Sequence, residues 1–118
     1  MPQLIACLST GKGTWGHVAR LLESPQWTTI ILLTNDYGKE NFNTTDKVTL
    51  LVINERMGLK ELREDIKTKL KPHLKDSEVG VNFISGTGKE HMALMSALLQ
   101  LGVGIRLIAL TKDGVEEI

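Results

Sequence analysis

Three glycines near the start of the chain form a turn that can approach a phosphate closely. Gly11, Gly13 and Gly16 follow the apolar run LIACL with the spacing G-x-G-x-x-G, and Asp36 lies twenty residues beyond Gly16. Glycines let backbone N–H groups reach a pyrophosphate, and an acidic residue about twenty positions later binds a ribose in dinucleotide-binding folds. The spacing alone therefore favours a dinucleotide-binding turn.

A second glycine-rich turn, ISGTGKEHMA, occupies residues 84–93. Each turn contains a lysine and precedes a segment with helical spacing, whose N-terminus presents unpaired N–H groups. Two such turns on neighbouring strands predict a small anionic ligand, namely a nucleotide. The candidate ligand-binding residues are Gly11, Lys12, Gly13, Trp15, His17, Asn35, Ser85, Gly86, Thr87, Gly88 and His91. We expect valine at Gly86 or Gly11 to weaken ligand binding by more than tenfold while the fold survives.

Several of these residues also have explanations that need no ligand. Thr87 and Glu90 match a capping box, Thr-x-x-Glu, which stabilises a helix start by itself. His91 follows within an apolar helix, where histidines commonly pack or cap. Trp15 lies beside the first turn, where its ring is suited to stack on a base. Asp36 is a common turn residue in TNDYG.

The elements that must position these turns alternate between strands and helices. Apolar runs predict buried strands, and period-3.6 patterns predict helices. The predicted strands span 3–9, 27–35, 47–54, 78–85 and 104–111, and the helices span 16–23, 58–71 and 88–101. This alternation predicts an α/β fold in one domain, with a Rossmann-like, doubly wound, mostly parallel sheet in the order 3-2-1-4-5 and helices on both faces. Residues 35–46 are expected to form a loop or short helix.

Two local features refine these elements. Pro72 is expected to end the long middle helix and to disfavour helical geometry at Lys71. The helix at 88–101 has almost no polar face, because its methionines and leucines are distributed around it. A helix that packs on such a sheet normally has one polar side exposed to solvent. The apolar pattern therefore favours a homodimer through 88–101 over burial of this helix beneath loops of the same chain.

Composition narrows the classes of partner. Fourteen basic residues balance fourteen acidic ones, so no general field attracts long nucleic acid. Cys7 lies inside an apolar run and is expected to be a buried structural thiol. We expect no metal site and no cofactor, because the chain shows no histidine–cysteine cluster, P-loop or G-x-S-x-G turn. No apolar run reaches the ~20 residues of a membrane helix, so a cytoplasmic protein without membrane contact is expected.

The phrase ISGTGKEHMALMSALL resembles the signature of CARF domains, the CRISPR-associated Rossmann-fold sensors of cyclic oligoadenylates. In that family the fourth strand ends in a Ser/Thr-Gly-Gly/Thr-x-Lys turn followed by a helix containing Met-Ala. The first turn, CLSTGKGTWGHVA, is similar to the family's other ligand loop. The resemblance implies a single CARF-like domain over 1–118 that binds a cyclic oligoadenylate, with cyclic tetra-adenylate favoured.

The chain leaves no room for an appended nuclease or helix-turn-helix domain, and so resembles the small stand-alone ring nucleases. That likeness implies metal-independent cleavage by the ribose 2′-hydroxyl, with Ser9 or Thr10 positioning the substrate and Lys89 stabilising the developing charge. Whether His17 or His91 transfers a proton is left open. Two alternatives remain: a sensor or sponge that binds the messenger unchanged, and a small subunit that binds NAD or another nucleotide.

Overall fold

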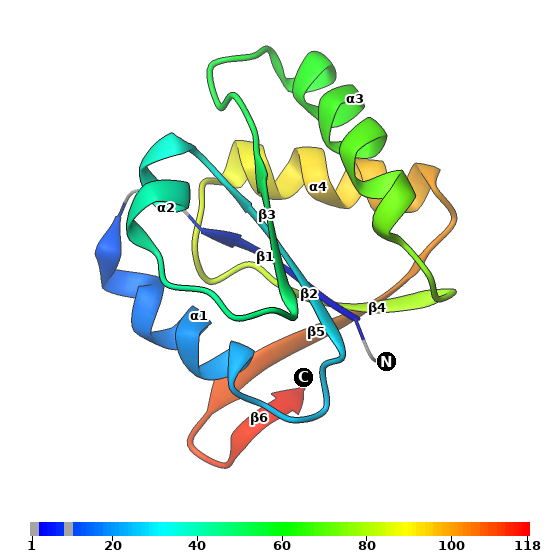
Figure 1. Cartoon of the computed structure of the whole chain (residues 1–118). Coiled ribbons are helices and arrows are strands. Elements are labelled where there is room, and N and C mark those ends of the chain that lie inside the picture. The colour runs from blue at the N-terminus through cyan, green and yellow to red at the C-terminus, as the bar shows by residue number, and fades with distance from the viewer. Residues whose placement is uncertain (1–2, 9–10) are drawn as a thin grey trace.

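A computed structural model describes residues 3–8 and 11–118, apart from the side chain of Lys12. Its centre is a six-stranded sheet (Figure 1). The strands are β1 (Gln3–Leu8), β2 (Thr29–Thr34), β3 (Val48–Val52), β4 (Glu78–Asn82), β5 (Gly104–Thr111) and β6 (Gly114–Glu117). Their order across the sheet is β3-β2-β1-β4-β5-β6, so the predicted order of the first five strands is confirmed.

Strands β1 to β5 are parallel, and β6 pairs antiparallel with β5. The prediction missed β6, because GVEE has one large apolar residue and little strand signal. A tight connection returns the chain from Thr111 to Gly114, whose φ of +112° favours glycine. Strands β1 and β4 are neighbours, so their carboxyl ends lie side by side. The winding of the sheet reverses its direction between these two strands, which makes this position the topological switch point.

The helices cover both faces of the sheet (Figure 1). They are α1 (Trp15–Leu22), α2 (Asp36–Asn41), α3 (Leu59–Leu70) and α4 (Gly88–Gln100), with 3-10 turns at Lys12–Thr14 and Lys71–His73. Helices α3 and α4 pack on one face of the sheet, and α1 packs on the other. The short helix α2 confirms one of the two alternatives predicted for residues 35–46.

Strand β1 is the centre of the core, because every residue of it is buried. Its side chains alternate between the two layers: Ile5 and Cys7 contact the α3/α4 layer, whereas Leu4, Ala6 and Leu8 contact the α1 layer. A strand covered on both faces reads as a continuous apolar run, which is why its position was predicted from sequence.

The outer strands differ from the prediction of uniformly buried strands. Strand β3 lies at the sheet edge and is only partly covered, with Thr49 exposed. Strand β5 exposes Arg106 and Leu107, because no helix fully covers the sheet beyond β4. The exposed Arg106 forms ion pairs with Glu78 at 2.9 Å and Glu117 at 3.4 Å. Apolar content therefore overstated the burial of these strands.

The predicted effect of Pro72 is partly wrong. Helix α3 ends at Leu70, as expected near a proline, but Lys71 keeps helical geometry with φ −48° and ψ −47°. Pro72 lies inside the 3-10 turn that follows, where a missing N–H costs little.

In the residues that the structure describes, no helix combines the length and apolar character needed to cross a bilayer.

Candidate functional site

The two predicted ligand turns follow β1 and β4, which are adjacent and parallel in the sheet. The turn after β4 lies directly against the end of β1, because a Cβ built on Gly86 would be 3.0 Å from the Cβ of Cys7. Ser9, Thr10 and the side chain of Lys12 lie outside the described residues. The structure thus brings the second turn to the β1–β4 switch point, where open α/β sheets bind ligands.

A capping box organises the N-terminus of α4. Thr87 Oγ1 accepts a hydrogen bond from the Glu90 N–H at 3.2 Å, and Glu90 Oε1 accepts one from the Thr87 N–H at 2.8 Å. The structural explanation of Thr87 and Glu90 is therefore confirmed. Within the described residues, the N–H groups of Gly88 and Lys89 have no partner, and they are the first-turn donors that an anion at this helix end would meet.

Gly86 gives the turn its shape. Its φ of +101° is rarely adopted by residues with a side chain, and its Cβ would also lie 3.0 Å from His91 Nε2. Valine here would strain the backbone and crowd Cys7 and His91, so we expect this change to lower the stability of the fold as well as ligand binding. At Gly88, in contrast, a Cβ would meet no atom within 4 Å.

Lys89 lies in the first turn of α4 with an exposed side chain. Its Nζ donates a hydrogen bond to the carbonyl oxygen of Glu55 at 3.1 Å, across thirty-four positions of sequence. An ammonium group has three donors, so two remain for a ligand while the first holds the β3–α3 loop. Sequence reasoning missed Glu55, because only the tertiary fold places this loop beside α4.

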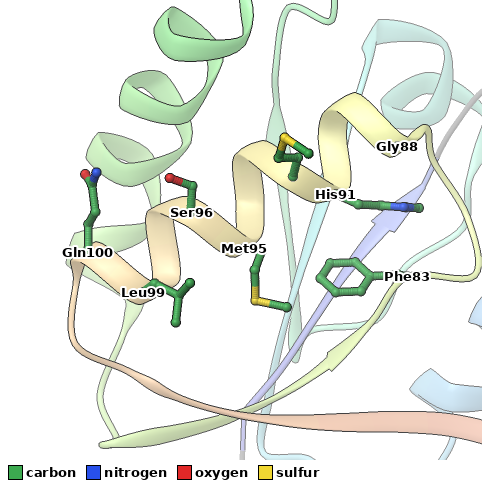
Figure 2. A pocket seen from close by; sticks show the side chains of 8 residues that line it. Phe83, Gly88, His91, Met95, Ser96, Leu99 and Gln100 are labelled. Carbon is green, nitrogen blue, oxygen red and sulfur yellow. The ribbon is translucent and has the colours of Figure 1, made fainter.

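His91 is held in place by two contacts. Its Nε2 donates to the carbonyl oxygen of Ser85 at 2.7 Å, and its ring lies 4.9 Å from the ring of Phe83 (Figure 2). Ser85 is buried, so these contacts fix the inner side of the turn. The structure therefore gives His91 the packing role that the sequence favoured, with its Nε2 proton already used.

His17 contacts the ends of β4 and β5 rather than the glycine turn. Its Nε2 accepts a hydrogen bond from the Leu110 N–H at 3.3 Å and lies 3.4 Å from Asn82 Nδ2. Accepting at Nε2 requires the neutral ring with its proton on Nδ1. Partial burial lowers the pKa of His17 from its ordinary value of 6.5, because a charged ring is poorly solvated there.

Trp15 packs in an aromatic cluster at the start of α1. Its ring lies 6.0 Å from that of Tyr37 and 5.5 Å from that of Phe42, edge-on in the second case. These contacts orient the indole and leave it half-buried.

Gly11 and Gly13 of the first turn are both exposed. A Cβ built on Gly13 would have no atom within 4 Å, so this part of the turn is accessible to a ligand.

Asn35 caps α2 rather than projecting freely. Its Oδ1 accepts from the Gly38 N–H at 2.9 Å, while its Nδ2 donates to Glu55 Oε2 at 3.3 Å. Asn35 therefore orients Glu55, whose carbonyl holds Lys89. Together these bonds link the ends of β2, β3 and β4 at one edge of the sheet.

Cys7 is fully buried, as predicted. Burial, reinforced by the negative charge of Glu90, raises the pKa of its thiol to about 12. The thiol is therefore protonated at neutral pH and is a poor nucleophile.

Among the described residues, no group of three or more His, Cys, Asp or Glu side chains lies close enough together to hold a metal ion.

An apolar groove runs along the outer face of α4, beginning at Gly88 in the turn (Figure 2). Leu94 and Leu98 point into the core, whereas Met92 is 61 % exposed and Leu99 is 65 % exposed. The groove has a volume of about 620 Å³ and is lined by Phe83, Gly88, His91, Met92, Met95, Ser96, Leu99 and Gln100. The predicted uncovered apolar stripe on this helix is confirmed.

Comparison with known proteins does not assign a family to the chain. No protein-family model matches it, and no curated protein matches it in sequence.

Proposed function

We propose that this chain is a Rossmann-like domain that binds a cyclic oligoadenylate, with cyclic tetra-adenylate as the favoured ring, and cleaves it as a ring nuclease. The observation that carries the proposal is the turn Ser85–Lys89 at the switch point, because it combines a positive-φ glycine, a helix N-terminus and a lysine. This combination suits a phosphodiester. The likeness of both turns to the ligand loops of CARF domains favours a cyclic oligoadenylate as the molecule that carries it. The activity would serve to end type III CRISPR antiviral signalling.

The donors at the turn suit a single phosphate. The N–H groups of Gly88 and Lys89 lie at the positive end of α4, and the Lys89 ammonium adds a full charge beside them. The buried carboxylate of Glu90 occupies the capping box, so its Oε1 is turned to the backbone of Thr87. A phosphate at this turn would meet donors first, as anion binding requires.

Cleavage uses a nucleophile that the substrate carries. The ribose 2′-oxygen attacks the adjacent phosphorus and loses its proton, a 2′,3′-cyclic phosphate forms, and the P–O5′ bond breaks as O5′ takes up a proton. Negative charge grows on the phosphoryl oxygens during this step. Lys89 stabilises that charge, and Ser9 or Thr10 aligns the attacking ribose. The reaction requires no protein nucleophile, which agrees with the unreactive state of Cys7.

A second copy of the chain completes the site. The lining of the α4 groove includes no Asp, Glu, Lys or Arg, so two copies can meet there about a two-fold axis without repulsion between such groups. Because the groove begins at Gly88, a copy seated on it lies next to the phosphate-binding turn. A two-fold dimer with two such turns matches the symmetry of a cyclic tetra-adenylate.

The direct test is to incubate the protein with labelled cyclic tetra-adenylate and to resolve the products by chromatography. We expect linear products ending in a 2′,3′-cyclic phosphate, formed equally well in EDTA because Lys89 supplies the stabilising charge. Loss of cleavage in EDTA that manganese restores would contradict this mechanism. Binding without cleavage would instead indicate a sensor or sponge, and absence of binding would exclude the proposed ligand.

A further inference from the structure

A polar hollow of about 680 Å³ opens at the carboxyl ends of β2 and β3, beside the phosphate-binding turn. Its walls come from the start of α2, from the loop between β3 and α3, and from one lysine of α3. The lining residues with polar side chains that bear on a ligand are Asp36, Tyr37, Asn54, Glu55, Arg56 and Lys69. The volume lies within the range of small-molecule sites, about 300–1,000 Å³.

Two hydrogen bonds join this hollow to the switch point. Lys89, in the turn, donates to the carbonyl oxygen of Glu55, which lines the hollow. Thr34 Oγ1 donates to the carbonyl oxygen of Leu8 at 2.8 Å and ties the end of β2 to the end of β1. The Lys89–Glu55 bond therefore places the hollow next to the residues proposed to bind the phosphate.

The charges of the hollow suit a neutral group better than a second phosphate. Asp36 and Glu55 offset Arg56 and Lys69, and the Lys69 ammonium is already bound to the carbonyl oxygen of Val52 at 2.7 Å and to a neighbouring carboxylate of α3. A phosphate there would face two carboxylates. A nucleoside, in contrast, offers donors to the carboxylates and acceptors to the cation.

Arg56 is the best placed group to contact a base. Its backbone N–H donates to Asn54 Oδ1 at 3.0 Å, which fixes the loop, while the guanidinium is exposed and has no partner among the described residues. Guanidinium planes stack on bases and donate to their acceptor edges. Glu55 is held by Asn35 at 3.3 Å, and Asp36, the first residue of α2, also lines the hollow, so both carboxylates can accept ribose hydroxyls.

We infer that this hollow is a nucleoside subsite, which holds the base and ribose of the nucleotide whose phosphate lies at the β4–α4 turn. Arg56 contacts the base, and Asp36 and Glu55 accept the ribose hydroxyls. The inference rests on the proposed function for the identity of the ligand as a nucleotide, and it assigns the base-contacting residue of that site.

The test is an NMR titration of the 15N-labelled protein with AMP and, separately, with ribose 5-phosphate. Both probes carry the same phosphate and sugar, and only AMP carries a base. We expect AMP to perturb backbone amides at 35–37 and 54–56 as well as 86–89. Ribose 5-phosphate should perturb the amides of Asp36 and Glu55 but should perturb that of Arg56 far less, because it lacks the base. Arg56→Ala should weaken AMP binding by about tenfold, since it removes a charged contact to the base. Arg20→Ala, an exposed arginine on α1, is the matched control and should leave the affinity unchanged.

Each remaining outcome overturns one proposal and not the other. Perturbation by AMP at 86–89 alone, or at neither region, would overturn the nucleoside subsite. The subsite is also overturned if cyclic tetra-adenylate binds Arg56→Ala as tightly as the unaltered protein, although the proposed function then stands. Conversely, AMP binding in the hollow with no binding of cyclic tetra-adenylate supports the subsite and refutes the proposed ring ligand.

Discussion

Lys89 and His17 show how one contact decides what a polar side chain can do. Lys89 donates to a single carbonyl and keeps two donors for a ligand, so its present bond and a catalytic role are compatible. His17 uses its Nε2 lone pair to accept a backbone N–H, so the same atom is not available as a base. The first residue is therefore a stronger candidate for chemistry than the second.

Lys89→Ala is expected to slow single-turnover cleavage of cyclic tetra-adenylate by about a hundredfold, comparable to removal of one oxyanion donor. Its effect on binding should be smaller, because the charge that Lys89 stabilises grows only in the transition state. Ser9→Ala and Thr10→Ala should have milder effects on the rate. Lys60→Ala, an exposed lysine on α3, is the control. Equal losses in binding and rate would argue against a transition-state role.

His17 is expected to make stability depend on pH. Its pKa is lower in the folded protein than the value of 6.5 that applies to the unfolded chain, so the unfolded chain binds more protons between the two values. The stabilising contribution is therefore fully present above pH 6.5 and is lost as the pH falls through the folded pKa. Urea denaturation of the protein and of His17→Gln, measured from pH 7.5 downward, should show a flatter profile for the variant. An unchanged profile would contradict this assignment.

At the scale of elements, the junction between β4 and α4 is the most constrained segment of the candidate site. The turn must place Gly86 against β1, bury Ser85 and start α4 with a capping box, all within the six residues 85–90. These demands separate its two glycines. At Gly86 the positive φ of the backbone requires glycine. At Gly88 the fold would accept a side chain, so only a bound ligand would require glycine there.

Alanine at these two glycines should therefore have different effects. Gly86→Ala is expected to lower the free energy of unfolding by about 1–3 kcal/mol, because its positive φ is strained with a side chain. Gly88→Ala should leave stability unchanged or raise it by up to about 1 kcal/mol. If a phosphate approaches this turn, Gly88→Ala should still weaken cyclic tetra-adenylate binding more than tenfold, about 1.4 kcal/mol. Denaturation and calorimetric titration measure the two effects separately, and full affinity in Gly88→Ala would place the ligand elsewhere.

At the scale of the whole molecule, the uneven covering of the sheet matters most. Its β1 centre is buried by helices on both faces, but the outer side of α4 and the neighbouring strand β5 remain exposed. Leu99 and Met92 on α4 and Leu107 on β5 are large apolar side chains in contact with solvent. Such a surface is typical of a protein interface.

Leu99→Glu is expected to convert a dimer into a monomer in light scattering. The side chain is 65 % exposed in one copy, so the charge should not disturb the fold of that copy, but it would be desolvated in a two-fold interface. Thr68→Glu, on the exposed side of α3, adds the same charge away from the groove and should leave the mass unchanged. A protein that is monomeric without substitution and still binds the ring tightly would refute the dimeric site.

The sequence by itself determined the parallel order of the first five strands, the burial of Cys7, the capping box and the apolar stripe on α4. These features depend on local pattern: continuous apolar runs, Thr-x-x-Glu spacing and helical periodicity. Strand β6 and the partial exposure of β3 and β5 were not predicted, because burial depends on which neighbours cover a strand and not on its own residues.

Only the tertiary structure decided which distant residues share the candidate site. Glu55 reaches Lys89 and Asn35, and Gly86 reaches Cys7, through contacts between segments far apart in the chain. The same holds for Arg56, which no motif marked and which lines the hollow because the β3–α3 loop folds over the ends of the strands. Sequence spacing carries no information about such pairings, since they are set by the strand order and by the packing of helices on the sheet.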